Sequence, residues 1–190
     1  MKLLIIGGVA GGATAAARAR RVSETAEITL IERGPYVSFA NCGLPYYISG
    51  DIAKRSRLLL QTPEGFDSRY GVKVLLGTEA MEIDRTNKRV LTRGPEGEAW
   101  YDYDRLILAQ GGNPVLPPLP GSDAPHAFKL WTVPDVDRIQ KFIAEARPKT
   151  AIIVGGGFIG LEMAEAFHTR GIATTVVELM PQVMSVMDRE

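Results

Sequence analysis

One pattern occurs twice in this chain and limits its possible folds more than any other feature of the sequence. Each copy is a short apolar run, a glycine-rich turn, a segment of good helix formers and a second apolar run that ends in a glutamate. The copies cover residues 3–32 and 151–178. This order of strand, glycine turn, helix, strand and carboxylate is that of the βαβ unit that binds a dinucleotide. The repeat predicts an α/β, Rossmann-like fold with two dinucleotide-binding domains.

The glycines of each turn have separate roles. The first permits a tight bend, the second lets the backbone approach a pyrophosphate, and the third lets the helix pack closely on the strand. The second copy has glycine at all three positions, which are Gly155, Gly157 and Gly160. In the first copy Val9 takes the middle position, between Gly7 and Gly12. A turn with only a structural role is the alternative for a single motif, and its repetition favours nucleotide binding.

The glutamate that ends each copy, Glu32 or Glu178, can accept hydrogen bonds from ribose hydroxyls. The Glu178 carboxylate would repel a 2′-phosphate, and no arginine follows it in residues 179–181, so we expect NAD(H) rather than NADP(H). Two dinucleotides in one chain are usually a flavin and a nicotinamide, because a hydride passes between their rings. The expected nucleotide-binding residues of the two copies are Gly7, Gly8, Val9, Ala10, Gly11, Gly12, Glu32 and Arg33, and Gly155, Gly157, Phe158, Ile159, Gly160 and Glu178.

Between the copies the pattern changes to short alternating runs separated by turn signals. These runs are Val72–Leu76, Glu79–Ile83, Arg89–Thr92 and Leu106–Ala109. We interpret them as a small antiparallel insert, at about residues 72–104, after which the chain returns to the parent sheet. The stretch that follows is rich in glycine and proline and predicts a linker, so the domains are expected at 1–112 and 113–190. A helix over Val133–Ala146, capped by Thr132, is expected in the second domain.

The composition excludes several classes of protein. Lysine plus arginine (22) balances aspartate plus glutamate (22), so bulk charge would not draw the chain to nucleic acid or to an anionic membrane. The apolar start ends at Gly7, too soon for a signal peptide or a membrane span, and we expect a cytoplasmic protein. One cysteine and two histidines are too few for an internal disulfide or a multi-cysteine metal site, so no metal is expected.

The single cysteine, Cys42, comes soon after Glu32, at the carboxyl edge of the sheet where ligands of α/β proteins bind. A helix that opens at Leu44 would favour its thiolate through backbone N–H groups and the helix dipole. Without a second cysteine, a redox role requires a mixed disulfide with a small thiol, a persulfide or a sulfenic acid. The alternative is that Cys42 is a small buried apolar residue.

The two glycine motifs and the run Ser-Phe-Ala-Asn-Cys at residues 38–42 resemble a known family. They are similar to the single-cysteine branch of the FAD-dependent pyridine nucleotide-disulfide oxidoreductases, above all to coenzyme A-disulfide reductases and NADH-dependent persulfide reductases. The resemblance runs from Met1 to about Asp188. It implies FAD in the first domain with a three-layer ββα insert, NAD(H) in the second, Cys42 as the redox cysteine that faces the flavin, and a homodimer in the full-length relatives.

The resemblance also implies a site for a coenzyme A-like disulfide or persulfide. Ser38 and Asn41 would hold the thiol end of the substrate, and Arg18 and Arg21 would contact its phosphates. The alternative for the two arginines is a solvated helix face.

Three further expectations follow from the family pattern. The residues Ala109 and Gly111 belong to a second flavin segment, in which Gln110 replaces the usual threonine, and Glu162 would lie near the nicotinamide unless it is an exposed helix carboxylate. NADH peroxidases and oxidases of the family carry a histidine where this chain has Ala10. Alanine cannot donate a hydrogen bond from its side chain, which favours disulfide or persulfide reduction over peroxide chemistry.

Two other functions remain open. One is an NADH oxidase that reduces oxygen at the flavin. The other is a non-catalytic dinucleotide-binding fragment, because relatives continue well beyond the point where this chain stops and the second domain would be incomplete. Such a truncated sheet is expected to leave apolar surface and strand edges open.

Overall fold

The computed structural model describes residues 1–188, so the last two residues of the expected second domain lie outside the described part. Its helices and strands, in chain order, are β1 (Lys2–Ile6), α1 (Gly11–Val22), β2 (Glu27–Ile31), α2 (Leu44–Ser49), α3 (Pro63–Tyr70), β3 (Val72–Leu75), β4 (Glu79–Asp84), β5 (Arg89–Gly94), β6 (Gly97–Asp102), β7 (Arg105–Leu108), α4 (Val133–Ala146), β8 (Thr150–Val154), α5 (Phe158–Thr169) and β9 (Ala173–Val177). Short 3₁₀ turns cover Asn41–Gly43 and Arg55–Leu58.

The chain forms two compact units. The first contains Met1–Phe39 and Leu59–Asn113, and the second contains Ala40–Leu58 and the chain from Pro114 onward. The sequence predicts one domain boundary, at residues 112–113. It does not predict that the segment after Phe39 packs with the second unit. As functional domains, 1–112 and 113–190 stay a prediction.

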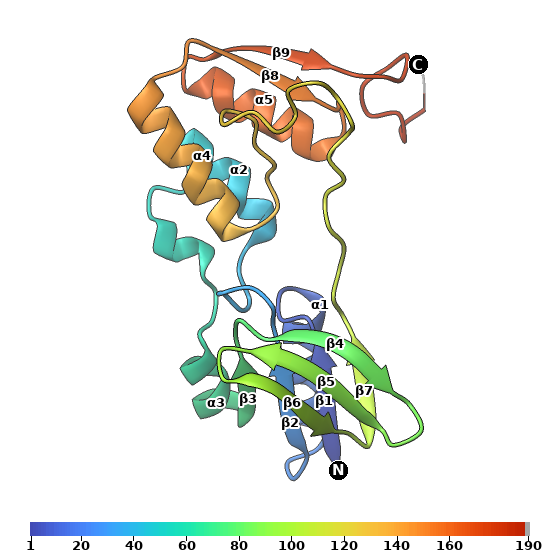
Figure 1. The fold of residues 1–190 in the computed structure, drawn as a ribbon. Helices are drawn as coiled ribbons and strands as arrows, with labels where there is room; N and C mark the ends of the chain where they lie inside the picture. Colours follow the sequence, from blue (N-terminus) through green and yellow to red (C-terminus); the bar gives the residue numbers. More distant parts are fainter. Residues whose placement is uncertain (189–190) are drawn as a thin grey trace. The chain divides into compact units, whose positions relative to one another are not determined.

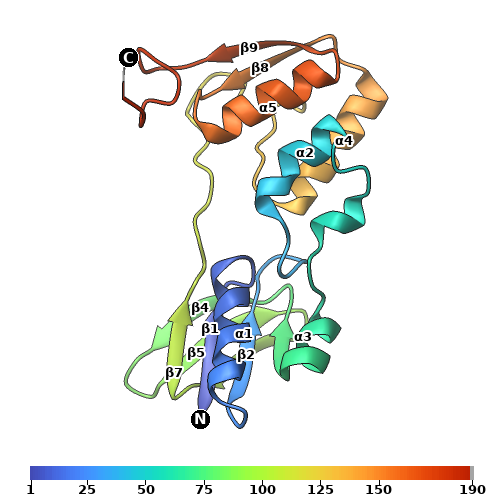
Figure 2. The same ribbon diagram turned by 180° about the vertical axis from the view of Figure 1, so that it is seen from behind.

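The first unit has three layers (Figures 1 and 2). Its centre is a parallel sheet in the order β3-β2-β1-β7. The antiparallel sheet β4-β5-β6 covers one face, where Val90 packs against Leu4 and Ile31. Helices α1 and α3 lie on the other face, where Ala16 and Phe66 are buried against the sheet. This arrangement confirms the α/β class with a ββα insert.

Strand β3 corrects one expectation. The sequence assigned Val72–Leu76 to the antiparallel insert, but β3 pairs parallel with β2, with Val72 opposite Ile28. The run alternates because β3 is an edge strand of the parallel sheet, with Val72 buried and Lys73 exposed. Strand β7 returns to the parent sheet parallel to β1, as predicted.

Two elements of the first unit were missed. Helix α3 leads into β3, and its amino end carries an N-cap signal: the Thr62 hydroxyl accepts a hydrogen bond from the Gly65 N–H, and Pro63 is the first helical residue. Strand β6 pairs antiparallel with β5 across the turn that begins at Gly94. The insert therefore consists of β4, β5 and β6.

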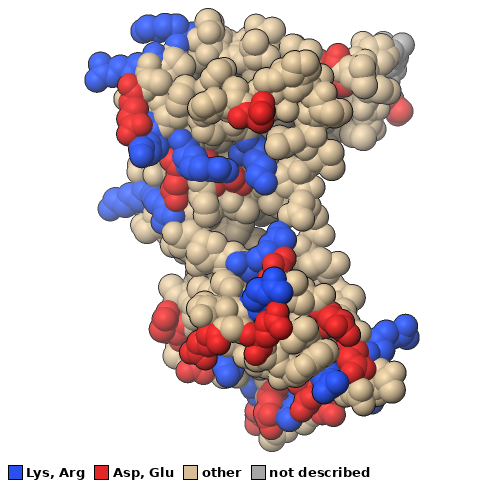
Figure 3. All heavy atoms as spheres, viewed as in Figure 1, with Lys and Arg blue, Asp and Glu red and all other residues tan. Residues whose placement is uncertain are grey.

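The outer face of the antiparallel sheet carries side chains of both charge signs (Figure 3). Arg93 pairs with Glu98 at 2.8 Å, and Arg89 pairs with Asp84 at 3.1 Å. Hydrogen bonds from Asn87 lower the pKa of Asp84 to about 2. This face thus presents mixed charge to solvent.

The second unit contains a parallel pair, β8 and β9, with α5 packed against it. Helix α4 has the predicted bounds and a capping box, in which the Thr132 N–H donates to the Asp135 carboxylate at 2.9 Å. Apolar side chains on the strands are exposed, with Ile152 71 % and Val154 60 % accessible. Within residues 1–188, no helix combines the length and the apolar character needed to cross a membrane.

Candidate functional site

The first glycine turn has the geometry that its motif predicts. Gly7 has φ +96°, a conformation that favours glycine, and its N–H donates to the Ile31 carbonyl at 2.8 Å. A Cβ atom on Gly12 would lie only 1.7 Å from the Gly7 carbonyl oxygen, so α1 begins this close to β1 only with glycine there. The turn therefore directs backbone N–H groups at the start of a twelve-residue helix outward, where an anion can bind.

Glu32 ends β2 beside this turn. One carboxylate oxygen accepts from the Gly8 N–H at 2.7 Å, and the other accepts from the Gly34 N–H at 2.6 Å. Both bonds fix the carboxylate at the carboxyl edge of the parallel sheet, where the sequence placed it for ribose binding.

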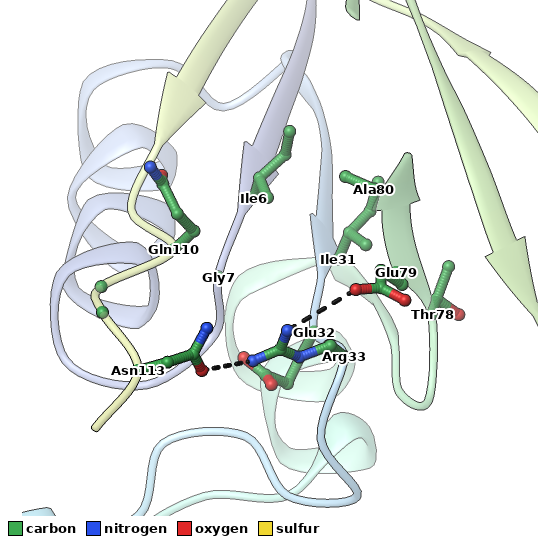
Figure 4. A pocket seen from close by; sticks show the side chains of 12 residues that line it. Ile6, Gly7, Ile31, Glu32, Arg33, Thr78, Glu79, Ala80, Gln110 and Asn113 are labelled. Carbon is green, nitrogen blue, oxygen red and sulfur yellow. Dashed lines mark hydrogen bonds and ion pairs between the residues drawn. The ribbon is translucent and has the colours of Figure 1, made fainter. Parts of the chain in front are cut away.

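A pocket of about 240 Å³ opens at this edge (Figure 4). The Arg33 guanidinium crosses it, 3.5 Å from the Glu79 carboxylate and hydrogen-bonded to the Asn113 side-chain oxygen at 2.9 Å. The lining residues come from the ends of β1 and β2, the start of β4 and the segment that follows β7: Ile6, Gly7, Ile31, Glu32, Arg33, Thr78, Glu79, Ala80, Gln110, Gly111, Gly112 and Asn113.

Four expected nucleotide-binding residues line this pocket: Gly7, Glu32, Arg33 and Gly111. Ala109 lies directly behind the turn, because its carbonyl oxygen would be 2.2 Å from a Cβ atom on Gly7. Sequence reasoning missed the contribution of Thr78, Glu79 and Asn113. The first two begin the antiparallel insert, and only their place after β3, a strand that the sequence assigned to the wrong sheet, would have revealed them.

The second glycine turn repeats the first. Gly155 has φ +108°, and a Cβ atom on Gly160 would lie 2.0 Å from the Gly155 carbonyl oxygen. Around Gly157, a Cβ atom would meet no described atom within 4 Å, which leaves the open space that a pyrophosphate needs. The expected neighbours Phe158 and Ile159 are exposed at the start of α5.

Glu178 ends β9 as Glu32 ends β2. Its carboxylate accepts from the Gly156 N–H at 2.6 Å and from the Met180 N–H at 2.8 Å. These backbone donors, with Met180 the larger influence, hold the pKa of Glu178 below its ordinary value. Glu162 is half-buried on α5, one turn into the helix.

Cys42 lies in the 3₁₀ turn that precedes α2, and its side chain is exposed. The alternative of a small buried residue is therefore wrong. Helix α2 opens at Leu44, as predicted, but the thiol contacts the Asn41 side-chain oxygen, 3.9 Å from Sγ. The two backbone N–H groups that follow the thiol differ from the expectation: the Gly43 N–H donates to the Ala40 carbonyl at 2.9 Å and the Leu44 N–H donates to the Asn41 carbonyl, so neither serves the sulfur.

Three of the four expected substrate residues lie together in the first unit. Arg18, Arg21 and Ser38 line a groove of about 370 Å³, with Gln61 and Tyr70 among its other walls. Ser38 has φ +47°, a strained conformation that a non-glycine residue keeps only where its surroundings impose it. Here its N–H donates to the Gly8 carbonyl and its carbonyl accepts from the Leu60 N–H. Asn41, the fourth, lies in the second unit.

Among the described residues, no cluster of three or more histidine, cysteine, aspartate or glutamate side chains could hold a metal ion. The features that could carry chemistry, each in its own unit, are the two glycine turns, the exposed Cys42 thiol and the groove with two arginines.

Comparison with known proteins gives consistent matches. The family model described as pyridine nucleotide-disulphide oxidoreductase matches residues 1–190. A coenzyme A disulfide reductase of Staphylococcus haemolyticus is 34 % identical to this chain, in an alignment that covers the whole chain and 43 % of the relative. An NADH oxidase of Methanocaldococcus jannaschii is also 34 % identical, in an alignment that covers 97 % of the chain and 41 % of the relative. The crystal structure of reduced Bacillus anthracis CoADR-RHD has a TM-score of 0.95 and 45 % identity, covering 98 % of this chain and 34 % of that protein. The chain thus spans about two-fifths of the length of these curated relatives.

Proposed function

The chain belongs to the pyridine nucleotide-disulphide oxidoreductase family, and on this premise we propose that it is part of a flavoprotein that uses NADH to reduce a small disulfide or persulfide. The proposed substrate is of the coenzyme A type, and the proposed redox sulfur is that of Cys42. One observation carries the proposal: two nucleotide turns of the same geometry flank, in the sequence, a single exposed thiol.

The residues present fit both cofactors. For FAD, the turn from Gly7 to Gly12 would hold the pyrophosphate, and Glu32 and Arg33 line the adjoining pocket. For NAD(H), the open space at Gly157 would hold the pyrophosphate, and the carboxylate of Glu178 would accept hydrogen bonds from the ribose. FAD, when bound, supplies the means of passing an electron pair from NADH to sulfur.

Cys42 is proposed to act by thiol–disulfide exchange. Its thiolate attacks one sulfur of the substrate RS–SR, a bond forms between Cys42 Sγ and that sulfur, and the other leaves as RS⁻. Two electrons and a proton from NADH, with a second proton from solvent, then restore the Cys42 thiolate and release both substrate halves as RSH. These 190 residues contain no second cysteine that could attack the mixed disulfide, so in the proposed step one substrate half stays on Cys42 until the electrons from NADH arrive.

The groove of the first unit supports an anionic substrate. Arg18 and Arg21 are exposed on α1 and give its wall positive charge, which suits the phosphates of a coenzyme A-like molecule. The strained Ser38 contributes a hydroxyl to the same groove. A cytoplasmic location and a homodimer also remain proposals, resting on the resemblance to reductases of small thiols.

An NADH oxidase is the second candidate, because the relative from Methanocaldococcus jannaschii carries that name. The two candidates differ in the electron acceptor. A disulfide reductase needs Cys42, whereas oxygen reduction at the flavin does not.

The test is anaerobic and aerobic NADH oxidation by the 190-residue chain and by Cys42→Ser, with coenzyme A disulfide as acceptor. A flavin absorbance that NADH bleaches, with disulfide reduction that Cys42→Ser abolishes, supports the proposal. Oxidation of NADH that scales with oxygen and is equal in both proteins overturns it in favour of the oxidase. A colourless protein without turnover overturns it in favour of a non-catalytic nucleotide-binding chain.

A further inference from the structure

The turn that carries Cys42 leads into a helix that cannot be stable alone. Helix α2 has six residues, Leu44–Ser49, and isolated helices shorter than about 12 residues are marginal in water. Contacts with other elements of the second unit must therefore hold α2 in place.

One face of α2 is held by burial. Leu44, Pro45 and Ile48 are buried, and the helix packs against α5 and α4. Apolar packing of this kind fixes the position of the helix, but it leaves the carbonyl groups of its last turn without partners inside the helix.

Two side chains from α4 and from the end of α5 supply those partners. The Gln140 side-chain amide donates to the Tyr47 carbonyl at 2.7 Å. The Arg170 guanidinium donates to the Ile48 carbonyl at 3.2 Å, and a second nitrogen of Arg170 lies 3.5 Å from the Gln140 side-chain oxygen. A cation at the carboxyl end of a helix is also favoured by the helix dipole.

The same segment is fastened a second time. Arg55, in the 3₁₀ turn beyond α2, donates to both carboxylate oxygens of Asp137 on α4, at 2.7 and 2.6 Å. The Cys42 segment is thus held at the end of α2 and again near its return to the first unit.

We propose that Gln140 and Arg170 are positioning residues for Cys42. They secure the carboxyl end of α2, and α2 begins two residues after the thiol, at a short turn in which the Gly43 N–H donates to the Ala40 carbonyl and the Leu44 N–H to the Asn41 carbonyl. Without them the carboxyl end of α2 keeps only its apolar packing, so the turn before it is held less firmly and the thiol samples more orientations. The inference rests on the proposed function only in taking Cys42 as the redox sulfur.

The test uses Gln140→Leu, Arg170→Met and their double variant in the 190-residue chain. Rate constants for reaction of Cys42 with coenzyme A disulfide and with iodoacetamide are measured without NADH, and hydrogen exchange is followed at α2 and β8. Arg170→Lys keeps a donor and serves as the rescue. Lys141→Met is the matched control, because Lys141 lies on α4 beside Gln140 but pairs only loosely with Glu145, at 3.9 Å.

Attack on a disulfide needs alignment of three sulfur atoms, whereas iodoacetamide is small and approaches an exposed thiol from many directions. In the double variant we expect the disulfide rate to fall about tenfold and the iodoacetamide rate to change by less than about twofold. Exchange at α2 should rise while exchange at β8 stays constant, Arg170→Lys should restore the disulfide rate, and Lys141→Met should change nothing.

Two results would overturn the proposal. Faster exchange at α2 with an unchanged ratio of the two rates would mean that the contacts are structural only, and unchanged exchange would mean that they do not secure α2. Neither outcome depends on turnover, so failure of the proposed function, seen as disulfide reduction that survives in Cys42→Ser, is distinguishable from failure of this inference.

Discussion

The two glycine turns have nearly the same geometry but very different surroundings. In both, the first glycine has a positive φ, the last glycine approaches the carbonyl of the first, and a glutamate accepts from the glycine N–H between them, at 2.7 and 2.6 Å. Around Gly7, however, a Cβ atom would lie 2.2 Å from the Ala109 carbonyl oxygen, whereas around Gly155 it would meet no described atom within 4 Å.

The neighbouring strands explain the difference. Leu4 and Ile152 occupy the same place in the two copies, yet Leu4 is 2 % exposed and Ile152 is 71 % exposed. Strand β7 and the antiparallel sheet cover β1, and β8 has no such cover within the described residues. The turn is thus shaped by its own βαβ segment, while burial depends on elements added from elsewhere in the chain.

The sharpest test of this comparison replaces Leu4 and Ile152 by alanine. We expect Leu4→Ala to lower the free energy of unfolding of the first unit by about 2–5 kcal/mol, because it leaves a cavity beside Ile31 and Val90. Ile152→Ala should change the second unit by less than about 0.5 kcal/mol. The unfolding of each unit in urea can be followed separately by tryptophan fluorescence, because Trp100 lies in the first unit and Trp131 in the second. Equal losses would contradict the comparison.

Replacing the first glycine of each turn should give a smaller contrast. Both Gly7→Ala and Gly155→Ala place a side chain at positive φ, which costs about 1–3 kcal/mol. Only Gly7→Ala also forces a Cβ atom against the Ala109 carbonyl, which we expect to add about 1–3 kcal/mol. The measurement is the same urea unfolding, in Trp131→Phe and Trp100→Phe backgrounds. A larger loss for Gly155→Ala would show that the second turn is the more crowded one in solution.

The smallest expected effect is on pH dependence. Backbone donors lower the pKa of Glu178 in the folded state, so its carboxylate stabilises the second unit above the ordinary pKa of 4.5, and this contribution is lost as the pH falls through the lowered pKa. Glu178→Gln should remove that part of the acid dependence, and Glu165→Gln, at an exposed position on α5, should leave it unchanged. Acid unfolding followed by Trp131 fluorescence tests this, and equal curves for the two variants would refute it.

Local signals explain what the sequence could predict. The turns, their helices and α4 depend on residues within a few positions of each other, such as Thr132 and Asp135, and these expectations agree with the structure. The assignment of β3 failed because an edge strand of a parallel sheet alternates like an antiparallel strand. Helix α3 also has a local signal, the N-cap Thr62 followed by Pro63, although it was not predicted.

The candidate site divides in the same way. Glu32 and Glu178 could be placed from their spacing to the glycines, since each follows its own βαβ unit. Glu79 and Asn113 meet Arg33 only because distant strand ends converge at one sheet edge. No pattern in residues 38–49 could indicate that α2 packs on α4 and α5.

The partners of α2 also lie far ahead in the order of synthesis. Gln140 is 93 residues beyond Tyr47, and Arg170 is 122 residues beyond Ile48. A ribosome that adds about 5–20 residues per second needs roughly 5–25 seconds to make these stretches. During this interval Cys42 has emerged without the helices that later hold its segment. The thiol is thus made well before the two side chains that hold its helix, which follow 93 and 122 residues later than the carbonyls they bind.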